Sequence, residues 1–305
     1  MSAPAGVTKD YSLARLTTVR VGGSADFFAR PETEEEVVDL LGWADREGLP
    51  VGVVGSGSNL LVSDDGFRGL VMKLAAELAR VERDGTHIVC GGGARLPSAA
   101  AKAAGWGLAG LEFGVNIPGT VGGAVRMNAN AYGGELARVL EVVTVCTPAG
   151  SEKRSPEDLG FRYRGSNLGE REVVAVASFA LSETDPADVK ATMADMRRRR
   201  KEAQPSGIKT FGSTVMNPED PRAEGRSAGQ LLDAAGCGGL QVGGARMSRK
   251  HANFVENTGN ATTADILEVM GEARRRVHEL FGVTLEPEVQ VLGEVRWPEQ
   301  WQLEP

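Results

Sequence analysis

Two long helices stand out in the pattern of apolar and polar positions. Thr33 and Glu36 have the spacing of a capping box, and the apolar positions after them keep helical spacing until Gly48, which suits a helix end. A last helix is predicted from Thr263 to Gly282 on the same grounds. The predicted apolar faces contain Val37, Val38, Leu40, Leu41 and Ala44 in the first helix and Ile266, Val269, Met270, Ala273, Val277 and Leu280 in the last.

Further elements alternate between these two helices. Short apolar runs of β-prone residues predict strands near residues 51–54, 87–90, 139–147 and 173–181. An alanine-rich helix is predicted over residues 97–104, and another begins at Asp185-Pro186, which has the form of an N-cap followed by a first-turn proline. Pro205 ends that helix, and the loop-rich stretch after it places a domain junction near residue 200. The mixture predicts an α+β protein of more than one domain.

Composition excludes several classes of protein. The chain has 305 residues, 41% of them hydrophobic, which is enough for packed cores. No apolar run reaches the length of a membrane helix and no signal peptide is evident, so we expect a cytoplasmic protein without a membrane partner. A net charge of −7 argues against nucleic-acid binding. The three cysteines lack metal-ligand spacing, so we expect buried thiols and no metal site.

Glycine is the unusual residue, with 40 copies that gather in particular loops. The segment Gly55-Ser56-Gly57-Ser58-Asn59-Leu60 follows a predicted strand, as a phosphate-binding loop does. It lacks the third glycine of the dinucleotide fingerprint and runs into β-prone residues, which argues against a Rossmann domain. An ordinary glycine/serine turn remains an alternative for this loop taken alone.

A second glycine-rich stretch spans residues 114–135 and contains Ile117-Pro118-Gly119-Thr120-Val121-Gly122-Gly123. It continues through Asn128-Ala129-Asn130-Ala131-Tyr132-Gly133-Gly134-Glu135. We expect such a stretch to stay out of the core and to let backbone lie against a planar or phosphorylated ligand. Loops of this length in compact domains are seldom merely structural.

These loops form part of an ordered series of motifs. Thr18-Val19-Arg20-Val21-Gly22-Gly23 precedes both of them, and Tyr163-Arg164-Gly165-Ser166, Gly212-Ser213, Asn217-Pro218, Ser227-Ala228-Gly229 and Leu285-Glu286-Pro287-Glu288-Val289 follow. In this order they resemble the UDP-N-acetylenolpyruvoylglucosamine reductases over nearly the whole chain. No obvious insertion lies between Phe179 and Asp185, so the chain resembles the shorter class of that family.

The resemblance implies a fold and its cofactors. It implies a two-subdomain FAD-binding fold of the vanillyl-alcohol oxidase/PCMH type and a C-terminal α+β substrate-binding domain. We expect residues 1–75, possibly with 289–305, to form the first FAD-binding subdomain, residues 76–200 the second, and residues 201–288 the substrate-binding domain. FAD is expected to bind non-covalently, because the loops contain neither His nor Cys, and NADPH is the implied hydride donor. The residues expected to bind the cofactor are Gly55, Ser56, Gly57, Ser58, Asn59, Leu60, Pro118, Gly119, Thr120, Gly122, Gly123, Asn128 and Tyr132.

The implied reaction reduces an enolpyruvyl ether to a lactyl ether in peptidoglycan precursor synthesis. Hydride goes from the flavin to C3, and a proton goes to C2. Arg164 matches the family's residue that holds the substrate carboxylate, and a guanidinium suits that role because it binds carboxylates by two hydrogen bonds. Ser213 is the expected proton donor and Glu288 the residue that polarises the carboxylate or acts as an acid. Arg162 and Glu286 are neighbours of the same type that we do not assign to the site.

Substrate contacts are expected from four further residues: Tyr163, Lys201, Asn217 and His251. The chain reads Val215-Met216 where the family usually places a basic residue before Asn217-Pro218. The resemblance implies a UDP-sugar as the partner, and a monomer is favoured. Two alternatives stay open from sequence: another FAD oxidoreductase of this fold acting on an alcohol, and a non-catalytic nucleotide-binding module.

Overall fold

A computed structural model describes residues 3–302 of the chain. The chain divides into two compact units, here called unit 1 and unit 2, and all described residues after Arg200 belong to unit 2. Unit 1 contains the N-terminal residues up to Asp10, Asp26–Ser56 and Arg68–Arg200, and unit 2 contains Tyr11–Ala25, Gly57–Phe67 and the residues from Lys201 onward. Two short segments of the predicted first subdomain, 11–25 and 57–67, thus belong to the same unit as the C-terminal region.

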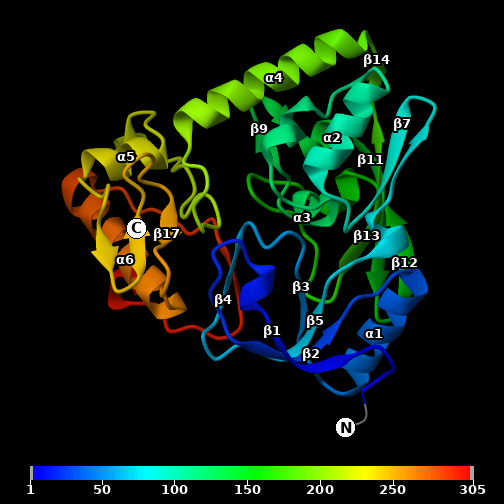
Figure 1. The fold of residues 1–305 in the computed structure, drawn as a ribbon, viewed down its shortest axis with the longest axis horizontal. Coiled ribbons are helices and arrows are strands. Elements are labelled where there is room, and N and C mark those ends of the chain that lie inside the picture. The colour runs from blue at the N-terminus through cyan, green and yellow to red at the C-terminus, as the bar shows by residue number, and fades with distance from the viewer. Residues whose placement is uncertain (1–2, 303–305) are drawn as a thin grey trace. The chain divides into compact units, whose positions relative to one another are not determined.

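Unit 1 is built on an antiparallel five-stranded sheet with the order β12-β11-β13-β7-β6 (Figure 1). Its strands are β6 (Val81–Asp84), β7 (His87–Gly91), β11 (Leu140–Thr147), β12 (Gly150–Arg154) and β13 (Val173–Ala180). The nearly continuous apolar run of β13 is typical of a strand that is covered on both sides. The strands predicted near residues 87–90, 139–147 and 173–181 are confirmed.

Helices cover both faces of this sheet. One core cluster joins Val143, Val145 and Phe179 of the sheet to the helices α2 (Leu96–Gly105) and α3 (Val121–Arg126). The other joins the opposite face to α1 (Glu34–Arg46). The long helix α4 (Pro186–Ala203) contributes only Val189 and Met193 to the core, in keeping with its charged sequence.

The helix α3 corrects one expectation. The glycine-rich stretch of residues 114–135 does enter the core, because Val121, Ala124 and Val125 are buried at helical spacing within it. Its glycines allow this close packing: the N–H of Gly122 donates to the carbonyl of Gly92 at 2.8 Å. The stretch is therefore partly a helix and partly an exposed loop.

The capping box at α1 differs slightly from the predicted one. The hydroxyl of Thr33 accepts a hydrogen bond from the N–H of Glu36, as expected. The carboxylate of Glu36, however, accepts from the N–H of Glu32 at 2.7 Å, one residue earlier than in the standard box. Gly48 has φ of +65°, which confirms it as the residue that ends the helix.

A smaller sheet has the order β1-β2-β5-β3 and contains segments through which the chain passes from one unit to the other. Its strands are β1 (Thr8–Ser12), β2 (Ser24–Ala29), β3 (Val51–Val53) and β5 (Phe67–Met72). Two short pairs complete unit 1: β8 (Leu108–Ala109) with β14 (Ser182–Glu183), and β9 (Asn130–Ala131) with β10 (Gly134–Glu135).

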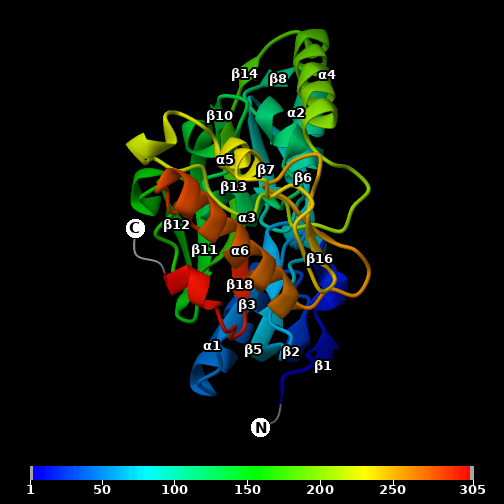
Figure 2. The same ribbon diagram turned by 90° about the vertical axis from the view of Figure 1, so that its left-hand side faces the viewer.

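Unit 2 packs the helices α5 (Ala228–Ala234) and α6 (Thr263–Phe281) with the sheet β15-β16-β17 (Figure 2). The strands are β15 (Gln241–Val242), β16 (Ala245–Met247) and β17 (Val255–Asn257). A parallel pair joins β4 (Leu60–Val62) to β18 (Gln290–Leu292). This pair connects the segment Gly57–Phe67 of unit 2 to the C-terminal part of the same unit. Short 3₁₀ turns occupy Ala14–Leu16, Ala76–Ala79, Glu112–Asn116, Leu136–Arg138, Glu157–Leu159, Pro221–Ala223 and Glu299–Gln302.

The helix α6 confirms the last predicted helix with one exception. A capping box of Thr262 and Asp265 begins it, and the Asp64 carboxylate accepts from the N–H groups of its first turn at 2.9 and 3.1 Å. Gly282 ends it in the left-handed conformation. Leu280 is 60% exposed and does not belong to the buried face. Across residues 3–302, no helix has both the length and the apolar character to cross a membrane.

Candidate functional site

The two glycine-rich loops meet in unit 1. A Cβ atom built on Gly55 would lie 2.3 Å from the hydroxyl oxygen of Thr120, which is far inside contact distance. Thr120 is the residue that precedes α3, and the carbonyl of Gly119 accepts from the N–H of Leu96 at 3.1 Å. The loops predicted to bind one ligand are thus neighbours. A Cβ on Gly119 would meet no described atom within 4 Å, so this face of the loop is open.

Three cations gather beside these loops. The ammonium group of Lys73 donates to the carbonyl of Gly55. Burial, together with repulsion from Arg30 and Arg95, lowers the pKa of Lys73 below its ordinary value. Among the described residues none of the three forms an ion pair with a carboxylate. A cluster of like charges without a counter-ion suits an anionic ligand, and no sequence motif had pointed to it.

Arg164 stands at the tip of a tight turn in unit 1. Arg162 and Gly165 exchange backbone hydrogen bonds of 3.0 and 3.1 Å, and Arg164 between them has φ of +55°. A left-handed arginine is strained, and such strain is often found at functional positions. The guanidinium lies over the ring of Tyr163, 5.1 Å from its centroid, and Tyr163 is 41% exposed.

The loop of residues 128–135 lies next to that turn. The buried amide of Asn128 donates to the Glu135 carboxylate at 2.7 Å and to the carbonyl of Arg162 at 3.3 Å, and it accepts from the N–H of Ala137. Its side chain is thus engaged within the protein. Tyr132 is left-handed and 40% exposed. Cofactor contacts by these residues remain predictions.

Unit 2 brings together the other two predicted catalytic residues. The segment of Ser213 lies between two others: Ser213 pairs with Phe254, and the N–H of Glu288 donates to the carbonyl of Thr214 at 2.9 Å. The side-chain amide of Asn59 donates to the carbonyl of Glu288 at 3.1 Å. The glycine loop, the predicted acid and the predicted proton donor are therefore neighbours along adjoining backbone segments.

A buried amide fixes the Ser213 segment. Asn253 is 4% exposed, and its side-chain oxygen accepts from the N–H groups of Thr214 and Val215 at 3.2 and 3.0 Å and from the Thr214 hydroxyl at 2.6 Å. Its amide nitrogen donates to the carbonyl of Val215 at 2.8 Å. Both the oxygen and the nitrogen of this side chain bond to the residues just after Ser213. The role of Asn253 is visible only in the structure, because Val215, to which it bonds, lies 38 residues earlier in the chain.

The two glutamates around Pro287 differ in their surroundings. Glu286 is exposed and lies 3.7 Å from the guanidinium of Arg274. Glu288 is half-buried and follows the residue that pairs with Val215. This difference favours Glu288 over Glu286 as the functional carboxylate.

The predicted substrate-binding residues of unit 2 have definite neighbours. The side-chain oxygen of Asn217 accepts from the N–H of Ala228 at 3.0 Å, at the first turn of α5. Burial lowers the pKa of His251 below its ordinary value, and the ring packs on Phe254 with a centroid distance of 4.9 Å. Lys201 is exposed at the end of α4.

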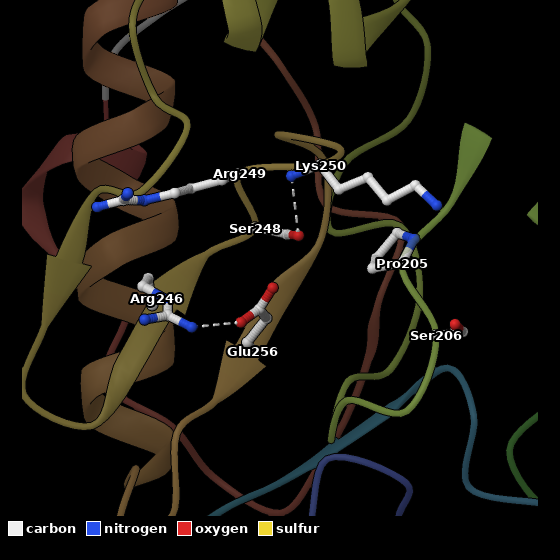
Figure 3. Close-up of a pocket in the computed structure, with 7 residues that line it drawn as sticks. All are labelled: Pro205, Ser206, Arg246, Ser248, Arg249, Lys250 and Glu256. Carbon is white, nitrogen blue, oxygen red and sulfur yellow. Dashed lines mark hydrogen bonds and ion pairs between the residues drawn. The ribbon is translucent and has the colours of Figure 1, made fainter. Parts of the chain in front are cut away.

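A polar cavity of about 540 Å³ opens next to the Ser213 pairing (Figure 3). Its lining residues are Pro205, Ser206, Arg246, Ser248, Arg249, Lys250 and Glu256. The N–H of Ser248 donates to the carbonyl of Phe254, the residue paired with Ser213.

Charges around this cavity are unevenly compensated. Glu256 binds Arg246 at 2.8 Å; burial alone would raise the pKa of Glu256, but hydrogen bonds from Arg246 and Ser248 lower it below its ordinary value. Arg249 and Lys250 form no ion pair within residues 3–302. Figure 3 shows their side chains pointing to opposite sides of the rim, and the Lys250 ammonium donates to the carbonyl of Lys201 at 2.7 Å.

The three cysteines are buried free thiols, as predicted. Burial raises the pKa of Cys90 and Cys146 to about 12 and that of Cys237 to about 11. Thiolate chemistry at neutral pH is therefore not expected from them.

Comparison with known proteins defines the class and then the family. Residues 25–155 match the FAD binding domain, so the chain is an FAD-dependent oxidoreductase with the PCMH/vanillyl-alcohol oxidase type of fold in its N-terminal part. Residues 204–292 match the C-terminal domain of UDP-N-acetylenolpyruvoylglucosamine reductase.

The relatives agree over nearly the whole chain. UDP-N-acetylenolpyruvoylglucosamine reductase 2 of Symbiobacterium thermophilum is 42% identical over 96% of this chain and 94% of its own. The reductase of Paramagnetospirillum magneticum is 44% identical over 93% of this chain and 91% of its own. The crystal structure of the Thermus caldophilus enzyme is 38% identical and superposes with a TM-score of 0.80, covering 96% of this chain and 98% of that one. The chain belongs to the UDP-N-acetylenolpyruvoylglucosamine reductase family.

Removal of the Asn253 amide should loosen the Ser213 segment. In Asn253→Ala the N–H of Val215 loses its buried acceptor, whereas the N–H of Thr214 keeps the backbone carbonyl of residue 253 at 2.9 Å. The loss should lower local stability by about 2 kcal/mol. Hydrogen exchange of the peptide that covers residues 211–217 measures this directly. Asn260→Ala, at an exposed asparagine of the same unit, is the control. Equal exchange in the two variants would show that Asn253 does not hold the segment.

Proposed function

We propose that this chain reduces UDP-N-acetylglucosamine enolpyruvate to UDP-N-acetylmuramate with hydride from NADPH, a step of peptidoglycan precursor synthesis. The family assignment supports the reaction. The observation that carries it to particular residues is the meeting of Asn59, Ser213 and Glu288 on adjoining segments of unit 2. A monomeric state and a cytoplasmic location stay predictions from the sequence.

The residues of unit 1 fit FAD. The open face at Gly119 leaves room for close approach of a ligand, and the uncompensated charges of Arg30, Lys73 and Arg95 suit a diphosphate. Gly55 and Thr120 would form the adjoining wall. Bound there, FAD would supply the transfer of hydride from NADPH to C3 of the enol double bond.

Three side chains then complete the reaction in this proposal. Arg164 holds the substrate carboxylate, into which negative charge spreads from C2. The hydroxyl of Ser213 gives its proton to C2 and is reprotonated from solvent, so that one hydride and one proton are added to the double bond. Glu288 polarises the carboxylate; it must be protonated there or offset by Arg164, because two like charges cannot share the site freely.

Ser213→Ala should separate the two halves of the reaction. NADPH should still reduce the flavin at the normal rate, whereas reoxidation by the enolpyruvyl substrate should slow by at least about 10²-fold, the scale of a lost general acid. Stopped-flow absorbance of the flavin measures both steps, and Ser182→Ala, at an exposed serine, serves as the control. Normal reoxidation in Ser213→Ala would remove Ser213 from the mechanism.

The cation cluster should recognise the phosphates of FAD and not its ring. Lys73→Gln is expected to weaken FAD binding by about tenfold, the scale of a charge-assisted hydrogen bond, with riboflavin binding unchanged. Equilibrium dialysis with each ligand measures this. Lys153→Gln removes an exposed lysine of the same unit as a control. Equal losses for FAD and riboflavin would mean that Lys73 acts only on loop structure.

The cavity beside the Ser213 pairing is the proposed place for the substrate diphosphate. It adjoins the proposed proton donor through Phe254 and Ser248, and its rim carries the uncompensated charges of Arg249 and Lys250. Phosphate oxygens are the ligands that such a polar, positively charged cavity favours.

Two double variants, each of which removes two positive charges, test this placement. The double variant Arg249→Gln/Lys250→Gln should bind UDP about tenfold more weakly in isothermal titration, and the difference should shrink as salt is added. Arg222→Gln/Arg296→Gln removes the same charge elsewhere in unit 2 and should leave UDP affinity near that of the wild type. If both double variants bind UDP equally, the diphosphate lies elsewhere.

A further inference from the structure

The guanidinium of Arg164 is oriented by a neighbouring amide. Its Nη1 donates to the side-chain oxygen Oδ1 of Asn130 at 3.0 Å and approaches the Asn130 carbonyl at 3.5 Å. Because a guanidinium only donates, the amide must present its oxygen to it. The guanidinium also lies over the aromatic ring of Tyr163, 5.1 Å from its centroid. Two independent contacts thus fix this side chain within unit 1.

Asn130 is itself held in a rigid setting. It lies in β9, where it pairs with Glu135 of β10 in an antiparallel ladder. The amide of Asn128 ties the start of this hairpin to the carbonyl of Arg162, inside the turn that carries Arg164. The hairpin and the Arg164 turn are therefore joined at two points.

Backbone strain gathers at the same place. Asn128, Tyr132 and Arg164 have φ of 41°, 52° and 55°, which are left-handed values that residues with side chains seldom adopt. Strained conformations persist where the surrounding structure holds them, and they are frequent where a side chain must be aimed at a ligand. The left-handed residues and the hydrogen bonds lie in the two segments that carry Asn130 and Arg164.

The chemical type of the partner matters. A carboxylate in place of Asn130 would also orient Arg164, but it would neutralise the positive charge that a substrate carboxylate needs. An amide oxygen is a neutral acceptor, so it orients the group and leaves the full charge in place.

We propose that Asn130 is a positioning residue that aims Arg164 at the carboxylate of the enolpyruvyl substrate. The proposal rests on the proposed function, in which Arg164 holds that carboxylate. It assigns to Asn130 no contact with the reacting atoms. Its action passes through the Asn130–Arg164 hydrogen bond alone.

A double-mutant cycle with Asn130→Ala and Arg164→Gln tests this in the full-length flavin-loaded enzyme. Asn130→Ala alone should raise KM for the enolpyruvyl substrate about tenfold, the scale of a lost hydrogen bond to a charged group, and leave flavin reduction by NADPH unchanged. In the Arg164→Gln background the same change should have almost no further effect. Additive effects in the cycle would overturn the proposal.

Asn130→Asp distinguishes a residue that orients Arg164 and leaves its charge available from a residue that only supports the local structure. It keeps the acceptor and the size of the side chain, so a structural role predicts wild-type kinetics. The proposal predicts instead a KM raised at least about tenfold, because the new carboxylate competes for Arg164. Wild-type KM in Asn130→Asp would contradict the proposal. Normal turnover in Arg164→Gln alone would instead refute the proposed role of Arg164, which is a separate failure.

Discussion

The close approach of Gly55 to Thr120 is the constraint on which the arrangement of unit 1 around its glycine loops depends. A side chain at position 55 would overlap the threonine hydroxyl, since its Cβ would lie 2.3 Å away. The contact brings the end of β3 against the start of α3, and Lys73 holds the Gly55 carbonyl from a third segment. Glycine is needed at position 55 for space alone, because its φ is not in the left-handed region. Gly48 has open space around it and favours glycine only through its left-handed backbone, and at Gly57 both reasons apply.

Unit 2 relies on backbone pairing and one buried amide in place of glycine packing. The segment of Ser213 lies between the segments of Phe254 and Glu288, and Asn253 satisfies the polar groups just after the serine. A buried amide in this position is costly to remove, because a buried partner such as the N–H of Val215 would lose its acceptor. The proposed proton donor therefore lies in a backbone segment that is bonded on both sides, while the proposed substrate cavity beside it carries exposed charges.

The sequence predicted those elements whose formation depends on residues close to one another in the chain. The apolar spacing of α6, its cap and Gly282 identified that helix, and β13 was recognisable from its continuous apolar run. Leu280 was misplaced because it lies in the last turn, where the helix face no longer meets the core. The short helix α3 was missed because its glycines outweighed the helical spacing of Val121, Ala124 and Val125. The contacts of Asn130, Asn253 and Lys73 could not be predicted from the sequence, since each of these side chains bonds to a residue distant in sequence. Arg164 and Glu288 were found through motifs; their roles await experiment.

The most direct test of the account is the product formed by the purified, flavin-loaded protein. NADPH oxidation should be slow alone and should rise steeply when UDP-N-acetylglucosamine enolpyruvate is added, with one UDP-N-acetylmuramate formed for each NADPH consumed. Oxidation that does not respond to the enolpyruvyl substrate, or that consumes NADPH without forming the lactyl ether, would contradict it.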